Sequence, residues 1–479
     1  MALRGHVETY SPTLIGGWAF DDDSPTAPVD VDIRIDGVVC ARVRADLPTF
    51  GGRVPRCGFA LRLPDELQAR RRRAMVSVEF AGTGATLTNA PRPLVFGRKT
   101  PRIAAWLTAG RRAYHDEVLP FANTPAEHIA SYNNIGDLMV YDSSLKLLSF
   151  SEMRSFNCFD WSDADVAQLN ANYDYCILRG SNYLHAKTNW RDIASLLARV
   201  KIPVIPFSVG AQAPRRRKLE VPAATTDVWK AFADHCGTIG VRGAHSAEIF
   251  ADIGIHNVEI IGCPSLFRAN DPYLQIVAKP LHAVEKITFS LRREIATTYT
   301  PDVDRYLRLQ RKLILELAEH FDVCASVHGE SHEKAFFYRD SDAIALARAE
   351  LFKRKWFESE DDPLLRIYEN QLFYAETVSQ FDEMVRKKDL SIGFRVHGVL
   401  PAMANGIPAM GVSYDSRGAE LYEALDVPTL TLDDIEQNSF STLYDSVRFE
   451  TFNRRFLGHY RRMRGWLERN GMAHNMIEV

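Results

Sequence analysis

Residues 390–415 read LSIGFRVHGVLPAMANGIPAMGVSYD, and this stretch decides the fold of the second part of the chain. LSIGF is an apolar run long enough for a buried strand, and VLPAMANG predicts a short helix that ends at a glycine. IPAMGVSY then returns as the next strand. A strand, a helix and a second strand in this order are typical of an open α/β sheet.

Arg395 and His397 lie where the first of these strands ends and the helix begins. In open α/β sheets, ligands bind at the carboxyl ends of the strands, and the first turn of a helix favours anions. A guanidinium can bind phosphate or carboxylate through two parallel hydrogen bonds, and an imidazole can exchange a proton near neutral pH. The pair therefore predicts acid/base chemistry on an anionic substrate. The alternative is structural, with Arg395 in a loop ion pair and His397 as a hydrogen-bonded buried histidine.

The same alternation of strands and helices extends over most of the chain. It predicts two doubly wound, Rossmann-like halves, over residues 98–275 and 276–440. The segment 441–479 has helical periodicity with many arginines. We expect it to form a closing helix across the two halves, and contact with an anionic membrane surface is the alternative.

Residues 1–97 show a different pattern, in which short apolar and polar runs alternate and turn residues such as the Asp36-Gly37 pair separate them. Period-2 alternation with such turns predicts a small all-β sandwich. The predicted fold class is therefore α/β, with two Rossmann-like halves preceded by this accessory domain.

Composition narrows the functional classes. The net charge of −3, with 25% charged and 46% hydrophobic residues, gives no basic excess for nucleic acid. The seven cysteines are scattered and never spaced as C-x-x-C, so we expect reduced thiols and no metal site. The beginning of the chain lacks the apolar segment of a signal peptide, and no stretch has the length of a membrane-spanning helix, which together predict a cytoplasmic protein.

Three more loops carry candidate residues where an expected strand or loop meets a helix. Gly136 can let a ligand approach the backbone, and Asp137 beside it is either a helix cap or a base. Arg242 stands between a strand and a helix, where Ser246 can cap that helix or contact an anion. His185 follows a strand and is a weaker candidate for a ligand contact.

Taken in order, these loops resemble the polysaccharide pyruvyl transferase family over roughly Tyr132 to Leu425. The residues that carry the resemblance are Asn134, Gly136, Asp137, Arg242, Ser246, Arg395 and His397. The resemblance implies a fold like that of the two-domain GT-B glycosyltransferases. It also implies phosphoenolpyruvate as the donor and transfer of pyruvate, as a ketal, to two hydroxyls of a sugar in cell-surface or exopolysaccharide biosynthesis.

The chain departs from the family pattern at two of these places. Cys263 stands before the proline where the family often has an aspartate, and Arg417 stands near the position of a common lysine. Arginine keeps the positive charge but changes its geometry. These departures bear on the substrate more than on the fold, and the thiol raises the question of whether the site is active.

The residues can be matched to the steps of ketal formation, which needs proton transfer and a clamp for anions. We assign proton transfer to His397, with His185 as a weaker alternative, and the handling of an acceptor hydroxyl to Asp137. Arg242 and Arg395 are expected to bind the donor. Asn134, Gly136, Ser246 and Arg417 complete the expected substrate site.

No cofactor and no metal are expected for this chemistry, because phosphoenolpyruvate is itself the donor. The expected partners are a saccharide acceptor, carried on a lipid in one version of the hypothesis, and the inner face of the cytoplasmic membrane, contacted peripherally. Two other functions fit the same sequence. One is a GT-B glycosyltransferase that uses a nucleotide sugar, and the other is a non-catalytic protein that binds carbohydrate through residues 1–97.

Overall fold

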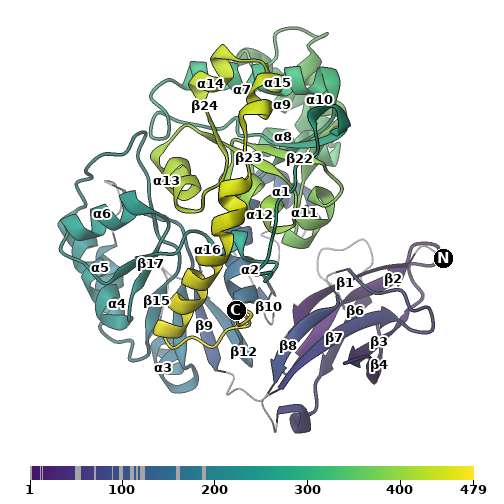
Figure 1. The fold of residues 1–479 in the computed structure, drawn as a ribbon, viewed down its shortest axis with the longest axis vertical. Coiled ribbons are helices and arrows are strands. Elements are labelled where there is room, and N and C mark those ends of the chain that lie inside the picture. Colours follow the sequence, from purple (N-terminus) through teal and green to yellow (C-terminus); the bar gives the residue numbers. More distant parts are fainter. Residues whose placement is uncertain are drawn as a thin grey trace. The chain divides into compact units, whose positions relative to one another are not determined.

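The computed structural model describes residues 3–10, 12, 14–48, 56–68, 72–88, 90–96, 101–107, 113–114, 117–118, 124–157, 162–185 and 190–479 (Figure 1). The chain forms two compact units. The first consists of Met1–Asn123, Leu145–Cys176 and Met472–Met476, and the second of Thr124–Ser144, Ile177–Gly471 and Ile477–Val479. The domain boundaries expected at residues 97, 275 and 440 stay predictions.

Two antiparallel sheets form the N-terminal part of the first unit. One sheet has the order β1 (Leu3–Tyr10), β2 (Leu14–Asp21), β6 (Arg56–Arg62), β5 (Leu47–Pro48), and the other has the order β4 (Val38–Arg44), β3 (Asp30–Ile35), β7 (Arg72–Phe80), β8 (Arg92–Phe96). Side chains along a strand alternate between its two faces. As a result Val7, Ile33 and Val78 from both sheets are fully buried in one core. The predicted all-β sandwich is confirmed.

The rest of the first unit mixes strands with a helix. β9 (Arg102–Leu107) and β12 (Glu152–Asn157) pair in parallel, and β10 (Ala113–Tyr114) pairs antiparallel with β11 (Glu117–Val118). The helix is α3 (Asp163–Asn172), and a capping box between Ser162 and Asp165 fixes its start.

The first half of the predicted α/β region continues mainly in the second unit, although the end of α2 and the start of β13 belong to the first. Its elements are α1 (Pro125–Ala130), α2 (Ile135–Leu147), β13 (Tyr175–Leu178), β14 (Asn182–Leu184), α4 (Arg191–Leu197), β15 (Val204–Pro206), β16 (Gly210–Ala211), α5 (Ala223–His235), β17 (Ile239–Val241), α6 (Ala244–Asp252) and β18 (Val258–Ile260). Two pairs of these strands, β14 with β16 and β17 with β18, are parallel. Strands and helices alternate as the sequence predicts.

The second half is built on a parallel sheet of six strands. The strands are β19 (Lys286–Ser290), β20 (Asp322–Val327), β21 (Leu372–Tyr374), β22 (Leu390–Gly393), β23 (Ala409–Ser413) and β24 (Thr429–Thr431), in the spatial order β21-β20-β19-β22-β23-β24. This is the Rossmann order, which reverses direction between β19 and β22. The prediction of an α/β fold with Rossmann-like halves after an all-β sandwich is confirmed.

Helices connect and cover these strands. They are α7 (Val303–His320), α8 (Ser331–Tyr338), α9 (Ser341–Lys353), α10 (Pro363–Asn370), α11 (Val378–Val385), α12 (Val396–Ala404), α13 (Ser416–Ala424), α14 (Leu432–Gln437), α15 (Phe440–Ser446) and the long α16 (Glu450–Arg469). Within the second unit α16, yellow in Figure 1, contacts both halves. Trp466 donates to the Thr238 carbonyl at 3.2 Å, and His459 pairs with Asp426 at 2.8 Å.

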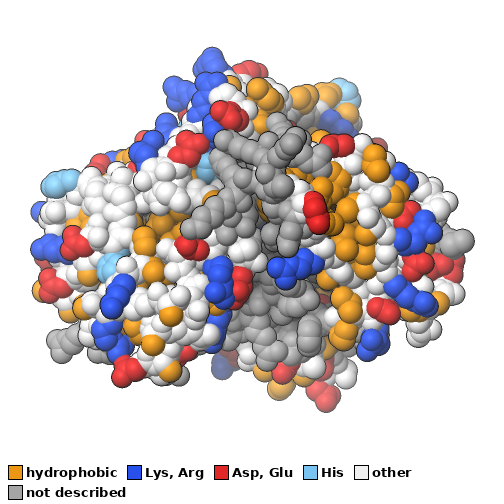
Figure 2. All heavy atoms as spheres, turned by 90° about the horizontal axis from the view of Figure 1, so that it is seen from below, with side chains coloured by type: hydrophobic (Ala, Val, Ile, Leu, Met, Phe, Trp, Pro, Cys, Tyr) orange, Lys and Arg blue, Asp and Glu red, His pale blue; other side chains and the backbone are white. Residues whose placement is uncertain are grey.

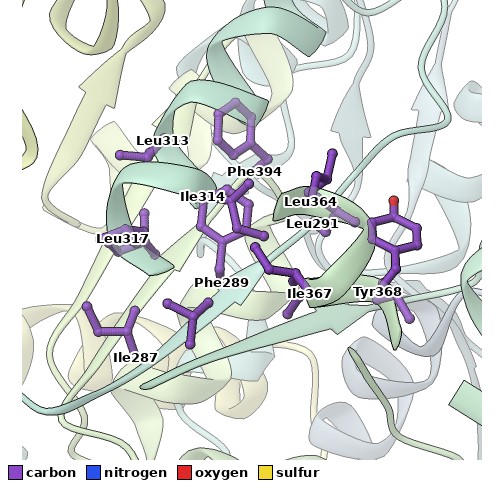
Figure 3. Close-up of a cluster of buried hydrophobic side chains, with 14 of the residues drawn as sticks. Ile287, Phe289, Leu291, Leu313, Ile314, Leu317, Leu364, Ile367, Tyr368 and Phe394 are labelled. Carbon is purple, nitrogen blue, oxygen red and sulfur yellow. The ribbon is translucent and has the colours of Figure 1, made fainter. Parts of the chain in front are cut away.

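The core of the second half forms between the central strand and its helices. Figure 3 shows Ile287 and Phe289 of β19 beside Leu313 and Leu317 of α7. The two leucines are one helical turn apart, so they share the buried face of α7. Burial of this face on β19 holds the strand whose carboxyl end enters the site described below.

The surface of the described residues carries both signs of charge. On the face in Figure 2, Lys and Arg side chains are interspersed with Asp and Glu side chains, and apolar side chains lie among them. Such mixing agrees with the net charge of −3. Among the helices that the structure describes, none combines the length and the apolar composition that crossing a membrane requires.

Replacement of Leu313 by alanine should lower the free energy of unfolding by about 2–5 kcal/mol, because it opens a cavity in this core. Denaturant unfolding followed by circular dichroism measures the change. Glu319→Ala, on the exposed face of the same helix, is the control and should change stability by less than about 0.5 kcal/mol. Equal effects of the two substitutions would contradict the packing of α7 on β19.

Candidate functional site

Four neighbouring strands of the six-stranded sheet end in polar side chains. Arg292 follows β19, Glu330 follows β20, Arg395 and His397 follow β22, and Arg417 follows β23. All four strands are parallel, so these ends meet at one edge of the sheet. The prediction that Arg395 and His397 lie between a strand and a helix is confirmed, since Arg395 is the residue before α12 and His397 lies in its first turn.

The first half brings its own strand ends to the same site. Arg179 follows β13, Arg242 follows β17 and Cys263 follows β18. The first turn of α2 adds Asp137, whose carboxylate pairs with the Arg179 guanidinium at 3.1 Å. Contacts between His397 and residues from these loops join the two halves of the site within the second unit.

His397 is half-buried and lies between the two halves. Its Nε2 lies 3.7 Å from the Cys263 sulfur. On the other side the backbone of Gly136 comes so close that an added Cβ atom would lie 3.0 Å from His397 Nδ1. A side chain at this position would crowd the imidazole, and the predicted approach of a ligand to the Gly136 backbone stays a prediction.

The electrostatic surroundings keep His397 uncharged. Burial lowers the pKa of the imidazole, and the positive charges of Arg242, Arg417 and Arg179 lower it further, to about 3, against the opposing effect of Asp137. At neutral pH the side chain is therefore a neutral imidazole.

Arg395 is bound within the protein. It forms a buried ion pair with Glu330, and its Nε donates to the Leu291 carbonyl at 3.0 Å. Burial alone would lower the pKa of the Arg395 guanidinium, but Glu330 and the Tyr132 hydroxyl outweigh that effect and raise it. The structural alternative, an ion-paired Arg395, matches this geometry, and its predicted contact with the donor stays a prediction.

Within the described part of the chain, neutral groups accept the side-chain hydrogen bonds of Arg242. Nη1 donates to the Asn182 amide oxygen at 2.6 Å, and Nε donates to the Ser208 carbonyl at 3.1 Å. Gly210 allows this packing, since an added Cβ would lie 2.7 Å from the Arg242 side chain. Burial lowers the pKa of the Arg242 guanidinium.

Ser246 and Asn134 serve local structure. Ser246 is fully buried, its hydroxyl donates to Glu420 at 2.7 Å, and the same hydroxyl accepts from the Ala211 amide at 2.8 Å. The Asn134 amide oxygen accepts from the Gly136 N–H at 3.1 Å. These bonds shape the loops around His397, and direct contact of either residue with a substrate stays a prediction.

Arg417 and His185 occupy different surroundings. The Arg417 guanidinium lies 3.2 Å from Asp415 and is near enough to His397 to affect its pKa. His185 lies half-buried at the end of β14, next to residues 186–189, which are outside the described part. Its role as an alternative acid stays a prediction.

His328, after β20, is also buried in the site. Burial lowers the pKa of its imidazole well below the usual value, and Arg395 and His397 add to the effect. Among the described residues, no group of three or more His, Cys, Asp or Glu side chains is arranged to hold a metal ion. The expectation of no metal stays a prediction.

The structure adds three charged residues that the sequence interpretation did not single out. These are Arg179, Arg292 and Glu330. Each follows a strand of the structure within three residues, as Arg395 does. Position at a strand end was therefore a usable signal, but the ion pairs between distant loops were not visible in the sequence.

A family model described as polysaccharide pyruvyl transferase matches residues 111–416, which is most of the 479-residue chain. The chain belongs to the polysaccharide pyruvyl transferase family. The resemblance seen in the sequence is thus confirmed, and Asp137, Arg242, Arg395 and His397 all lie in the matched region. The family is one of transferases that act on polysaccharides.

The solved structures whose backbone follows a similar path have low sequence identity to this chain. The UDP-GlcNAc 2-epimerase of Methanocaldococcus jannaschii has 10% identity and a TM-score of 0.37, with 72% of this chain and 92% of that chain covered. SnogD, a glycosyltransferase from Streptomyces nogalater, has 10% identity and a TM-score of 0.31, with 76% and 95% covered. Similarity this low supports no argument about function. No curated protein matches the sequence.

The low pKa of His397 makes stability depend on pH in this pyruvyl transferase family member. An ordinary histidine titrates near 6.5, so as the pH falls below that value the unfolded chain takes up a proton that folded His397 refuses. The wild type should lose up to about 1.4 kcal/mol per pH unit relative to His397→Gln. When the pH is lowered from 7.5 to 5, the melting temperature of the wild type should therefore fall more than that of His397→Gln.

His256→Gln, at an exposed position, is the control and should show no such shift. A difference between wild type and His397→Gln that stays constant with pH would show that His397 titrates normally.

Proposed function

We propose that this protein transfers pyruvate from phosphoenolpyruvate to two hydroxyls of a saccharide, as a ketal, in the assembly of a cell-surface polysaccharide. The observation that carries the proposal is a neutral, half-buried His397 surrounded by arginines at the carboxyl ends of parallel strands. Membership in the polysaccharide pyruvyl transferase family supports it. A donor with carboxylate and phosphate groups suits the positive charge of this site.

The reaction balances without an oxidant or a reductant. A proton adds to the methylene carbon of the donor, and a sugar hydroxyl attacks C2 and loses its proton. The bond between C2 and the phosphate oxygen then breaks, and a second hydroxyl attacks C2 and also loses its proton. One of the two released protons restores the acid, and the other leaves with the phosphate. No cofactor is proposed.

His397 can serve as the acid because the donor itself brings negative charge. Three arginines hold the imidazole neutral in the free protein, and a bound anion would oppose their effect and raise the pKa of His397. The imidazole would then take up a proton and deliver it to the methylene carbon. The donor thus creates the acid that its own reaction needs.

Asp137 is the proposed base for the acceptor hydroxyl. Its side chain is 31% exposed and is held by the almost fully buried Arg179. Accessibility allows a saccharide to reach the carboxylate, and the ion pair fixes its direction. Arg242 is proposed to bind the donor, since neutral groups hold it, while His185 stays the weaker alternative for the acid.

A test combines phosphate release from phosphoenolpyruvate with mass detection of the saccharide, over a panel of free and lipid-linked oligosaccharides. Acceptor-dependent release with a pyruvyl ketal mass gain is expected. His397→Ala should lower turnover about 10²–10⁴-fold, the usual contribution of general acid catalysis, and His256→Ala should leave it unchanged. Stabilisation by a nucleotide sugar but not by phosphoenolpyruvate would instead favour a glycosyltransferase.

We further propose that the acceptor is carried on a lipid and that α16 contacts the anionic inner face of the cytoplasmic membrane. Arg454, Arg461 and Arg462 are exposed on the face of α16 opposite its buried side, and residues 451–467 contain no Asp or Glu. Tyr273 and Val277, 67% and 78% exposed, lie on the segment that binds Asn453 of α16 through Ile276. Cations beside exposed apolar side chains suit such a surface.

Arginine substitution should separate this contact from catalysis. Arg454→Gln/Arg461→Gln/Arg462→Gln should reduce cosedimentation with phosphatidylglycerol vesicles at least several-fold, because each basic residue near an anionic surface contributes about 1 kcal/mol. The control Lys353→Gln/Arg354→Gln/Lys355→Gln removes the same charge from exposed positions at the end of α9. Equal loss in both variants would mean that only net charge matters, and no loss in either would reject the contact.

A further inference from the structure

Arg292, like Arg242, differs from three other arginines of the site in its charge balance. Arg179 faces Asp137, Arg395 faces Glu330 and Arg417 faces Asp415. Within the described part of the chain, no carboxylate forms an ion pair with Arg292, although this side chain is 5% exposed. A buried cation normally has an anionic partner, so Arg292 has charge to offer a ligand.

The hydrogen bonds of Arg292 also leave donors available. Its Nη1 donates to the Tyr414 hydroxyl at 2.6 Å, and Arg417 Nη2 donates to the same oxygen at 3.2 Å. The Nε groups of both arginines are buried and have no hydrogen-bond partner among the described residues. A guanidinium carries five N–H donors, and here one donor from each arginine is directed at the same neutral oxygen.

Tyr299 holds the two guanidiniums in place. Its ring centroid lies 4.2 Å from the central carbon of Arg292 and 5.4 Å from that of Arg417. Stacking covers the flat face of a guanidinium, whereas the N–H donors point outward in its plane. The aromatic ring therefore orients the donors without blocking them, which lowers the entropy lost when an anion binds.

The position of this pair in the sheet is the one where Rossmann-like folds bind ligands. Arg292 follows β19, and the strand order reverses between β19 and β22. Arg417 extends the pair toward β23 and is also one of the cations around His397. An anion held by the two arginines would thus lie beside the proposed acid.

We propose that Arg292 and Arg417 form a phosphate-binding site, with Tyr299 and Tyr414 as its positioning residues. Two guanidiniums match the double negative charge of a phosphate better than the single charge of a carboxylate. As the binding site for the donor's phosphate, the pair rests on the proposed function. Arg395 then acts as a positioning residue, because Glu330 balances its charge.

Calorimetric titration of the full chain with inorganic phosphate, and separately with pyruvate, tests this site. Arg292→Gln should raise the Kd for phosphate at least about tenfold, and Arg292→Lys should raise it less, because lysine keeps the charge but loses the planar fork. Neither should change the Kd for pyruvate. Arg293→Lys is the matched control, since Arg293 is equally buried but is paired with Glu333, and it should leave phosphate binding unchanged.

Circular dichroism establishes that each variant is folded. Should Arg292→Gln not fold, Arg417→Gln tests the same pair, since the Arg417 side chain is 16% exposed, and the same tenfold loss is expected. Wild-type affinity for phosphate in the arginine variants, or no phosphate binding by the wild type, would overturn the inference. So would loss of pyruvate binding with phosphate binding intact.

Failure of the proposed function gives a different result. If the wild type binds phosphate through Arg292 but releases none from phosphoenolpyruvate with any acceptor, the phosphate site stands and the pyruvyl transfer does not.

Discussion

The site depends on one buried ion pair, between Arg395 and Glu330. Glu330 also accepts the backbone N–H of Gly329 at 3.1 Å, and Arg395 also donates to the Leu291 carbonyl at 3.0 Å. Two buried charges are stable only when each satisfies the other and both are hydrogen-bonded. The pair therefore ties together the ends of β20, β19 and β22. His397 lies two residues after Arg395, so its position follows from the same constraint.

Charge balance around this pair determines which residues can act on a ligand. The carboxylates of Asp137, Glu330 and Asp415 each face one arginine, while Arg242 and Arg292 are held by neutral oxygens. Burial is the main reason that the pKa of His397 is low, and the positive charge of Arg242 adds to it, with smaller effects of Arg417 and Arg179. The imidazole is therefore neutral at neutral pH.

Sequence patterns were sufficient for the fold and for the location of the site. The apolar runs in LSIGF and IPAMGVSY predicted strands β22 and β23, and the expected polar residues do follow the strands. The interaction partners of these residues could not be predicted, because a pattern along the chain cannot show which distant loops meet. Arg395 and Glu330 are 65 residues apart, and Ser246 and Glu420 are 174 apart. Arg292 was missed for the same reason, since its significance lies in lacking a carboxylate that its neighbours have.

Cys263, which stands where the family often has an aspartate, affects the charge around His397. A carboxylate 3.7 Å from His397 Nε2 would carry a permanent negative charge at neutral pH and would raise the pKa of the imidazole, whereas an ordinary thiol carries no such charge. Under the proposed function, the negative charge that prepares His397 as the acid would therefore come from the donor. Proton uptake would then be coupled to donor binding.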